Sequence, residues 1–211
     1  MRSVGREFTT YQTATHAFRD KYFALPGDTT NAISIWGSVA GPATCYSNTA
    51  ATGTATCNGN GDGMVSGYSN DAVAGYGNEN YRFWQHLANA GLIEGRYSGR
   101  LETGGSVAGL NAPTSKYHVG AWFVDNYNNA GSNQNCRRNH GNFFQLANAK
   151  LSPESAWNVD VKYDDGKPCQ GNVIISPVNS CTNAANGTIL TTDYNLTVTT
   201  EPCTISFINA M

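Results

Sequence analysis

Aromatic residues near the start of the chain recur at helical spacing. One stripe, at steps of three and four positions, consists of Phe8, Tyr11, Thr15, Phe18 and Tyr22. Side chains spaced in this way lie on one face of an α-helix. The pattern predicts a helix from about residue 6 to residue 24 that packs the stripe against a sheet. Pro26 ends this helix, because proline cannot continue one.

A second helix is predicted near residues 79–91. Asn78 is a suitable N-cap, and Glu79 suits the positive end of the helix dipole. From Phe83 onward the apolar positions again recur at steps of three and four. A short turn of helix is also expected at residues 31–36.

The rest of the chain shows strand patterns. Runs rich in β-branched and aromatic residues predict strands at residues 117–124, 143–146, 158–163, 172–176, 196–200 and 204–208. In the third of these, valines alternate with polar residues, and the Asp164-Asp165-Gly166 run that follows predicts a hairpin turn.

Helices that precede strands indicate an α+β fold, here an N-terminal α-helix packed on an antiparallel β-sheet with long, disulfide-stapled loops. We expect a single domain over residues 1–211. Its first helix occupies residues 1–25, and a loop region that contains the second helix spans residues 26–116. The sheet and the C-terminal loops occupy residues 117–211.

Composition narrows the class of protein. Only 13% of the residues are charged, about half the usual share, and the formal net charge is −2. Nucleic-acid binding requires clustered Lys and Arg, so no nucleic-acid partner is expected. The low charge, with many Gly, Asn, Thr and Ser residues, is typical of a loop-rich protein outside the cytosol.

The six cysteines favour disulfides and an oxidising compartment, because their number is even, their spacing is wide and the chain carries little charge. None of them forms a C-x-x-C pair, which argues against a zinc ribbon or a thioredoxin-like motif. Two pairs of cysteines would each close a short local loop, and each closure contributes about 3 kcal/mol in the chain-entropy model. Fifteen pairings are possible. The expected disulfides are Cys45–Cys57, Cys169–Cys181 and, as the remaining pair, Cys136–Cys203.

Four blocks of sequence carry a resemblance. The first ends in Leu25-Pro26-Gly27-Asp28, and the second is Asn60-Gly61-Asp62-Gly63. The third runs from position 83 to 95, and the fourth from position 152 to 173. In this order they resemble prepilin-type proteins, the subunits of type IV pili and of type II secretion pseudopili.

The resemblance implies a pilin-like fold in which residues 1–25 form the C-terminal half of the long pilin helix. It implies a non-enzymatic filament subunit, periplasmic or extracellular, whose partners are other copies of itself and other pilin-like subunits. The family's apolar N-terminal segment is absent from this sequence, and we expect it to have been removed. That segment would anchor the full-length precursor in the inner membrane. The residues implied in assembly and packing are Phe8, Tyr11, Phe18 and Tyr22.

A second hypothesis keeps the same fold. The chain would be a minor pilin or surface adhesin that binds a glycan or a protein ligand through its loops. Four tryptophans and eleven tyrosines could line a sugar-binding surface, although aromatic residues at this frequency are more often core or interface.

One loop resembles the opening of a calcium site. Asn58, Asn60 and Asp62 place oxygen-bearing side chains at alternate positions before a glycine, as an EF-hand loop begins. The twelfth position is Ser69 where an EF-hand has Glu. The alternatives are a weak calcium site, with Asp62 the main carboxylate, and a glycine-rich turn. No cofactor is required by the sequence.

No enzymatic activity is predicted. Asp160, Asp164 and Asp165 could pair as in glycoside hydrolysis, but the hairpin turn explains them better. The histidines lack metal-ligand spacing, and His16 and His86 are expected on helix surfaces. No G-x-S-x-G motif is present.

Overall fold

The computed structural model describes residues 2–39, 53–66, 79–117, 120–127, 136, 141–147, 150–184 and 192–211. These residues form a mixed helix and sheet structure, which confirms the α+β class. The elements are, in chain order, α1 (Arg2–Tyr22), α2 (Ala32–Trp36), α3 (Glu79–Asn89), β1 (Ala121–Tyr127), β2 (Gly141–Ala147), α4 (Pro153–Tyr163), β3 (Val173–Ser176), α5 (Val178–Cys181) and β4 (Thr204–Ile208).

The four strands form one antiparallel sheet in the order β1-β2-β4-β3. The last strand of the chain therefore inserts between β2 and β3. Phe144 of β2 lies opposite Phe207 of β4, which in turn pairs with Val173 of β3. All three side chains are buried, so the centre of the sheet is also the centre of the core.

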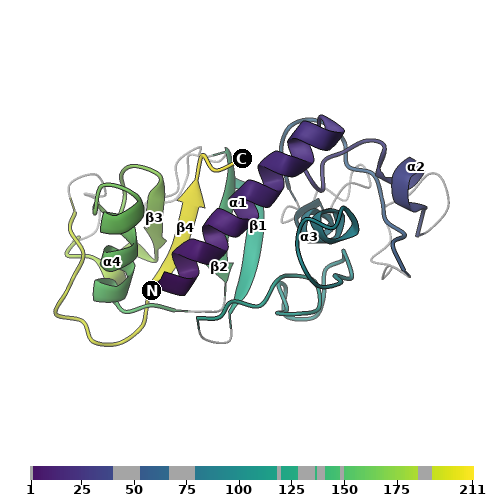
Figure 1. The fold of residues 1–211 in the computed structure, drawn as a ribbon. Coiled ribbons are helices and arrows are strands. Elements are labelled where there is room, and N and C mark those ends of the chain that lie inside the picture. Colours follow the sequence, from purple (N-terminus) through teal and green to yellow (C-terminus); the bar gives the residue numbers. More distant parts are fainter. Residues whose placement is uncertain are drawn as a thin grey trace.

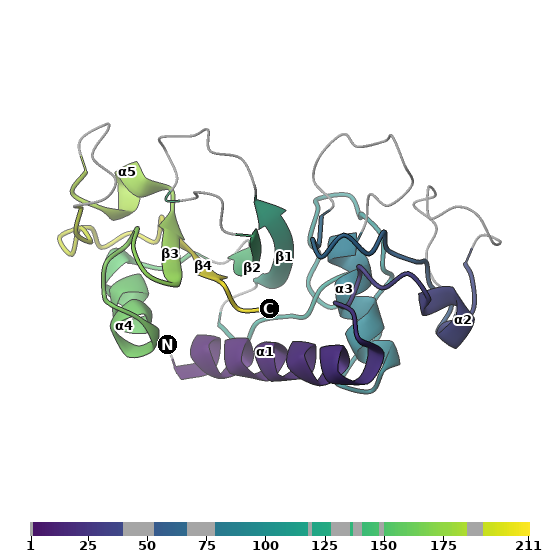
Figure 2. The same cartoon turned by 90° about the horizontal axis from the view of Figure 1, so that it is seen from above.

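Helix α1 crosses one face of the sheet, from α4 at its N-terminal end to α3 at its C-terminal end (Figures 1 and 2). Phe8 stacks on Phe207 of β4 with 4.0 Å between ring centroids. One turn later, Tyr11 meets Trp84 of α3 edge-on at 5.1 Å and Trp122 of β1 at 5.5 Å. The first half of the stripe therefore packs on the sheet, as predicted.

The second half of the stripe lies elsewhere. Phe18 is fully buried, but its ring lies against Tyr22 of the same helix, Trp36 of α2 and His86 of α3. Tyr22 also contacts Trp36, at 5.4 Å between centroids. The expectation that the whole stripe packs on the sheet was wrong, because α1 extends past β1 and its last turns cover α2 and α3 instead.

The predicted strand at residues 158–163 is wrong, since these residues belong to α4. Ser152 caps the helix by accepting a hydrogen bond from the Ser155 N–H, and Pro153 occupies the first turn. Its buried residues, Ala156, Val159 and Asp160, follow a helical spacing, so the alternation of valines was misleading. The Asp164-Asp165-Gly166 run consequently follows a helix and is not a hairpin turn.

Two disulfides are described, and both correct the predicted pairing. Cys136 bonds Cys169, and Cys181 bonds Cys203. The pairs Cys169–Cys181 and Cys136–Cys203 were therefore wrong. The β3–β4 register explains one of the bonds, because Thr204 pairs with Ser176 and so brings Cys203 towards α5. The sheet, and not closeness in sequence, selects the partner.

Cys57 is also disulfide-bonded, while its expected partner, Cys45, lies outside the described residues. Disulfides persist in oxidising compartments such as the periplasm and the extracellular space. None of the described helices combines the length and the apolar composition that a membrane crossing requires.

The remaining expectations had mixed outcomes. Helix α2 and strands β3 and β4 lie where they were predicted, and β1 lies a few positions later than expected. The strand expected at residues 196–200 is wrong, because this segment is a turn in which the Val198 N–H donates to the Asn195 carbonyl. The Asn78 N-cap lies outside the described residues.

Candidate functional site

Three of the four resemblance blocks meet at one place, between the end of α1 and helix α3. The backbone at Gly27 has a φ of 84°, a left-handed conformation that favours glycine. A Cβ on Gly27 would collide with the Glu79 carbonyl, and a Cβ on Gly59 would collide with the backbone of Gly27 and Asp28. Gly27 and Gly59 therefore allow three segments of the chain to touch backbone to backbone.

The buried side chain of His86 connects α3 to the turn at Gly27 and to the segment around Thr56. It is fully buried, which corrects its expected place on a helix surface. The Gly27 N–H donates to its Nδ1 at 2.9 Å, so Nδ1 is an acceptor and the ring proton is on Nε2. Nε2 lies 2.8 Å from the Thr56 hydroxyl. Burial lowers the pKa of His86 to about 3, which keeps the ring neutral.

The hydrogen bonds continue along α3. Thr56 Oγ1 donates to Gln85 Oε1 at 2.7 Å, and Arg82 Nη1 donates to the same oxygen at 2.8 Å. Gln85 Nε2 donates to the Ala55 carbonyl. The polar side chains of α3 therefore hold the segment around Thr56 and the turn at Gly27 in place by hydrogen bonds.

Beside this network lies a group of three acidic residues, which we call the α3 cluster: Asp28, Asp62 and Glu79. One carboxylate oxygen of each lies within 4.8 Å of the others. Asp28 and Glu79 are buried, whereas Asp62 is exposed. The three residues come from three separate segments of the chain.

The buried carboxylates organise the loop that carries Asp62. Asp28 accepts hydrogen bonds from the N–H groups of Gly61, at 2.7 Å, of Asp62 and of Gly63. Glu79 accepts from the N–H groups of Asn60 and Ser66, at 2.9 and 3.2 Å. These two side chains hold the backbone of residues 60–66 in place.

Burial also changes the titration of the cluster. It raises the pKa of Glu79 to about 8, against the lowering effect of its two N–H donors. Burial likewise raises the pKa of Asp28 despite its three donors. Desolvation penalises the charged form of a carboxyl, so a proton or a cation at this place would relieve the cost.

The expected calcium ligands are only partly brought together. Asp62 belongs to the α3 cluster, but the Asn58 side-chain oxygen accepts from the Ile33 N–H of α2. Asn60 exchanges hydrogen bonds with Asp62 inside the turn. A cation here would use the carboxylates of Asp28, Asp62 and Glu79, which keep lone pairs beyond those given to N–H donors.

A second acidic group, the α4 cluster, consists of Asp160, Asp164 and Asp165. Asp160 is buried and accepts hydrogen bonds from the Tyr194 hydroxyl at 2.7 Å and the Gly166 N–H at 3.0 Å. Burial raises its pKa to about 7. Asp164 accepts from the N–H groups of Asn172 and Val173. The hydrogen bonds of this cluster hold the loop between α4 and β3 in place.

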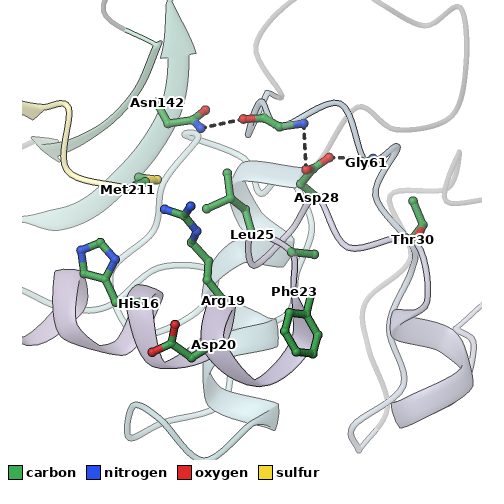
Figure 3. A pocket seen from close by; sticks show the side chains of 12 residues that line it. His16, Arg19, Asp20, Phe23, Leu25, Asp28, Thr30, Gly61, Asn142 and Met211 are labelled. Atoms are coloured by element: carbon green, nitrogen blue, oxygen red, sulfur yellow. Dashed lines mark hydrogen bonds between the residues drawn. The ribbon is translucent and has the colours of Figure 1, made fainter.

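A hollow of about 920 Å³ lies between the C-terminal end of α1, the Asp28 turn and the end of the chain (Figure 3). Its lining includes the exposed side chains of His16, Arg19 and Asp20, as well as Met211. Asn142 of β2 joins the sheet to the rim by donating to the Gly63 carbonyl, at 2.9 Å. His16 is exposed, as predicted.

Asp28, Glu79 and His86 were not identified as site residues from the sequence. Asp28 and Glu79 had been noted only as a turn residue and a helix-start residue. The sequence does contain one signal for these residues, namely the glycines near them, which indicate close contact between backbone segments. It does not show which segments are in contact.

No protein-family model, curated protein or solved structure matches this chain.

Proposed function

We propose that this chain is the globular head of a pilin-like filament subunit, of a type IV pilus or of a type II secretion pseudopilus. The observation that carries the proposal is the long α1 laid across one face of an antiparallel sheet (Figure 2). The resemblance of the four sequence blocks implies this same arrangement, with α1 as the C-terminal half of the long pilin helix.

The geometry suits a mechanical role. Phe8 ties α1 to β4, Tyr11 ties it to β1 and α3, and Phe18 ties it to α2 and α3. A load applied along α1 would thereby be passed to the sheet and to helices α2 and α3. Disulfides at Cys169 and Cys203 hold the loops around β3 and β4.

The polar clusters support the non-enzymatic part of the proposal. Both ring nitrogens of His86 are engaged in hydrogen bonds, and the buried carboxylates of Asp28 and Glu79 accept backbone N–H groups. These groups hold loops in place. A general base needs a free position directed at a substrate, and the ring of His86 has none.

The test concerns the precursor that the gene encodes. We expect a short basic leader, a glycine and about 20 apolar residues leading directly into α1. Co-expression with a prepilin peptidase and an assembly system should give processed precursor and filaments that contain this head. A conventional signal sequence joined directly to this chain would contradict the proposal.

A second candidate function is a minor pilin or adhesin that binds a ligand. The hollow beside Arg19 favours it, since it combines charged side chains with the exposed ring of Phe23. A glycan screen with the wild type and with Arg19→Ala tests this directly. Binding that the substitution abolishes supports an adhesin, and uniform absence of binding rejects a glycan as its ligand.

A further inference from the structure

The loop between α5 and β4 carries a sequence that is a candidate for covalent modification. Asn195-Leu196-Thr197 fits the pattern at which an oligosaccharide is attached to asparagine, namely Asn, any residue except proline, and then Ser or Thr. The chain contains one other such tripeptide, Asn186-Gly187-Thr188, which lies outside the described residues. The filament proposal assigns no role to either of them.

The two tripeptides differ at the position two residues before the asparagine. Asp193 stands there in the first, and Ala184 in the second. Bacterial enzymes that transfer oligosaccharides to asparagine select an acidic residue at this place, where a carboxylate can pair with a cationic side chain of the enzyme. The run Asp193-Tyr194-Asn195-Leu196-Thr197 therefore meets the longer bacterial pattern, and the segment around Asn186 does not.

Hydrogen bonds fix the backbone on the N-terminal side of Asn195. The Asn183 N–H donates to the Asp193 carbonyl at 3.0 Å, and the Asn195 N–H donates to the Cys181 carbonyl at 2.9 Å. Between them Tyr194 forms an antiparallel bridge to the residue that follows α5, and its side chain is buried. Because side chains alternate along an extended segment, Asp193 and Asn195 share the opposite, outward face.

On the C-terminal side, a turn brings Thr197 back to Asn195. The Val198 N–H donates to the Asn195 carbonyl at 3.1 Å. The side-chain oxygen of Asn195 accepts hydrogen bonds from the Thr197 hydroxyl at 2.6 Å and from the Thr197 N–H at 3.3 Å. Asn195 is half-buried, whereas Leu196 and Thr197 are exposed. The acidic residue, the asparagine and the hydroxyl that specify the pattern thus lie together at the surface.

The side-chain nitrogen of Asn195 is the atom that would be modified. An N–H group can only donate, so the amide atom that faces the Thr197 N–H is the oxygen. Nδ2 then lies on the other arm of the planar amide. Within the part of the chain that the structure describes, no group accepts a hydrogen bond from Nδ2. The nitrogen is therefore not needed to hold the turn.

The carboxylate of Asp193 is available in spite of its ion pair. Lys167 Nζ lies 2.6 Å from Asp193 Oδ1, and the two side chains are 48% and 64% exposed. A pair this exposed contributes little, because water and salt screen it. Asp193 can exchange Lys167 for a cationic side chain of an enzyme at little cost.

The place of the loop suits a modification made after export. The Cys181–Cys203 disulfide encloses the segment, and disulfides form outside the cytosol, on the side of the membrane where oligosaccharides are transferred. The segment between α5 and β4 lies beside α4, at the end of the molecule opposite α2 (Figures 1 and 2). The α3 cluster and the hollow at Arg19 lie elsewhere.

We propose that Asn195 is a site of N-linked glycosylation, modified by an enzyme of the bacterial class that recognises Asp193. The donor is an oligosaccharide linked to a polyprenyl pyrophosphate. A bond forms between Nδ2 and C1 of the first sugar, the bond between C1 and the pyrophosphate oxygen breaks, and Nδ2 loses one proton. The lipid pyrophosphate is the leaving group. The inference requires an exported chain and does not depend on the filament function.

The first measurement is peptide mapping by mass spectrometry on the chain isolated from the cells that encode it. The peptide that contains Asn195 should carry the added mass of a carbohydrate, and the peptide that contains Asn186 should not. A native chain in which the Asn195 peptide has only the mass of its sequence overturns the proposal.

The second measurement assigns the recognition residues. The chain is exported to the periplasm of a bacterial host that is supplied with such an oligosaccharyltransferase and its lipid-linked oligosaccharide. The wild type should gain one glycan, whereas Asn195→Gln, Thr197→Ala and Asp193→Ala should each remain unmodified. Thr197→Ser and Asp193→Glu keep the hydroxyl and the carboxylate, so they should be modified like the wild type.

The second tripeptide provides a matched control. Ala184→Asp supplies the missing acidic residue before Asn186 and should produce a second glycan there. A wild type modified at Asn186, or an Asp193→Ala variant modified as fully as the wild type, would show that the acidic residue does not select the site. Either result overturns the proposed recognition.

Two further variants separate recognition from folding. Asn195→Gln should melt at nearly the same temperature as unmodified wild type, so the absence of its glycan does not reflect misfolding. Lys167→Met breaks the ion pair and leaves Asp193 in place, so it should be modified as fully as the wild type. Loss of the glycan in Lys167→Met would show that the ion pair, and not the free carboxylate, determines modification, which contradicts the proposal.

Discussion

The α3 cluster and the α4 cluster are built to the same plan. Each has a buried carboxyl whose pKa is raised, Asp160 in the α4 cluster and both Glu79 and Asp28 in the α3 cluster. Each has a carboxylate that accepts hydrogen bonds from a loop backbone, namely Asp28 and Asp164. Both clusters thus use acidic side chains to give structure to segments that lack regular hydrogen bonding.

They differ in the number of backbone N–H groups that they hold. The members of the α3 cluster are residues 28, 62 and 79, whereas those of the α4 cluster lie within residues 160–165. Asp28 and Glu79 accept hydrogen bonds from five backbone N–H groups, and Asp160 and Asp164 accept from three. We therefore expect the α3 cluster to matter more for stability, and the predictions below test this difference.

The largest effect is expected from removing the loop-binding carboxylates. Asp28→Ala deprives three N–H groups of their acceptor and should lower the free energy of unfolding by about 3–4 kcal/mol. Asp164→Ala deprives two and should cost about 1–2 kcal/mol. Urea unfolding of both variants measures the difference.

Asp28→Asn is the matched control, because it keeps an acceptor oxygen at the same place. It should recover part of the loss seen in Asp28→Ala. Equal losses for Asp28→Ala and Asp164→Ala would mean that the two clusters contribute alike, whatever the number of N–H groups that each carboxylate accepts.

The second effect is the dependence of stability on pH. The pKa of Glu79 rises from 4.5 to about 8, and that of Asp160 from 3.8 to about 7. Between those values the folded chain keeps protons that the unfolded chain has released. Stability should therefore be greatest below about pH 4 and fall as pH rises through about 7 and 8, where the two folded-state carboxyls lose their protons.

Two variants assign this pH dependence to the clusters. Glu79→Gln should remove the part that extends to about pH 8, and Asp160→Asn the part that ends near pH 7. Unfolding measured from pH 4 to 9 checks both. A wild-type stability that rises across this range would show that neither carboxyl titrates as expected.

Calcium should act on one cluster only. An affinity of roughly 0.1–1 mM is typical of extracellular sites, and calcium at ten times Kd would stabilise the chain by about 1.4 kcal/mol. The melting temperature should rise by a few degrees, more at pH 8 than at pH 6, because Glu79 must be ionised to bind.

The comparison uses Asp62→Ala in the α3 cluster and Asp165→Ala in the α4 cluster. Melting in chelator and in millimolar calcium should show a shift in the wild type and in Asp165→Ala, but none in Asp62→Ala. Identical midpoints in every sample would leave the glycine-rich turn as the correct interpretation of residues 58–63.

The smallest effect belongs to an ion pair near the α4 cluster. Lys167 Nζ lies 2.6 Å from Asp193 Oδ1, and both side chains are largely exposed. Lys167→Met should cost about 0.5 kcal/mol or less, and less still in high salt. A loss above about 1.5 kcal/mol in thermal unfolding would show that this pair contributes to the fastening of the loop.

The sequence predicted the elements whose signal is local. The stripe of α1 repeats at helical spacing, and β3 and β4 are short β-branched runs. Helix α4 shows the weakness of such signals, because Val159 and Val161 alternate while the cap at Ser152 indicates a helix. Burial decided between the two patterns, and Val161 is 52% exposed.

What the sequence by itself determined is the α+β class, the position of α1, and the presence of disulfides in a chain of low charge. Only the tertiary structure decided the partners. The register of β3 on β4 brings Cys203 to Cys181, and glycines at positions 27 and 59 allow Asp28 to reach Glu79. Periodicity records which face of a segment is buried, whereas the contact between two distant segments depends on the packing of everything that lies between them.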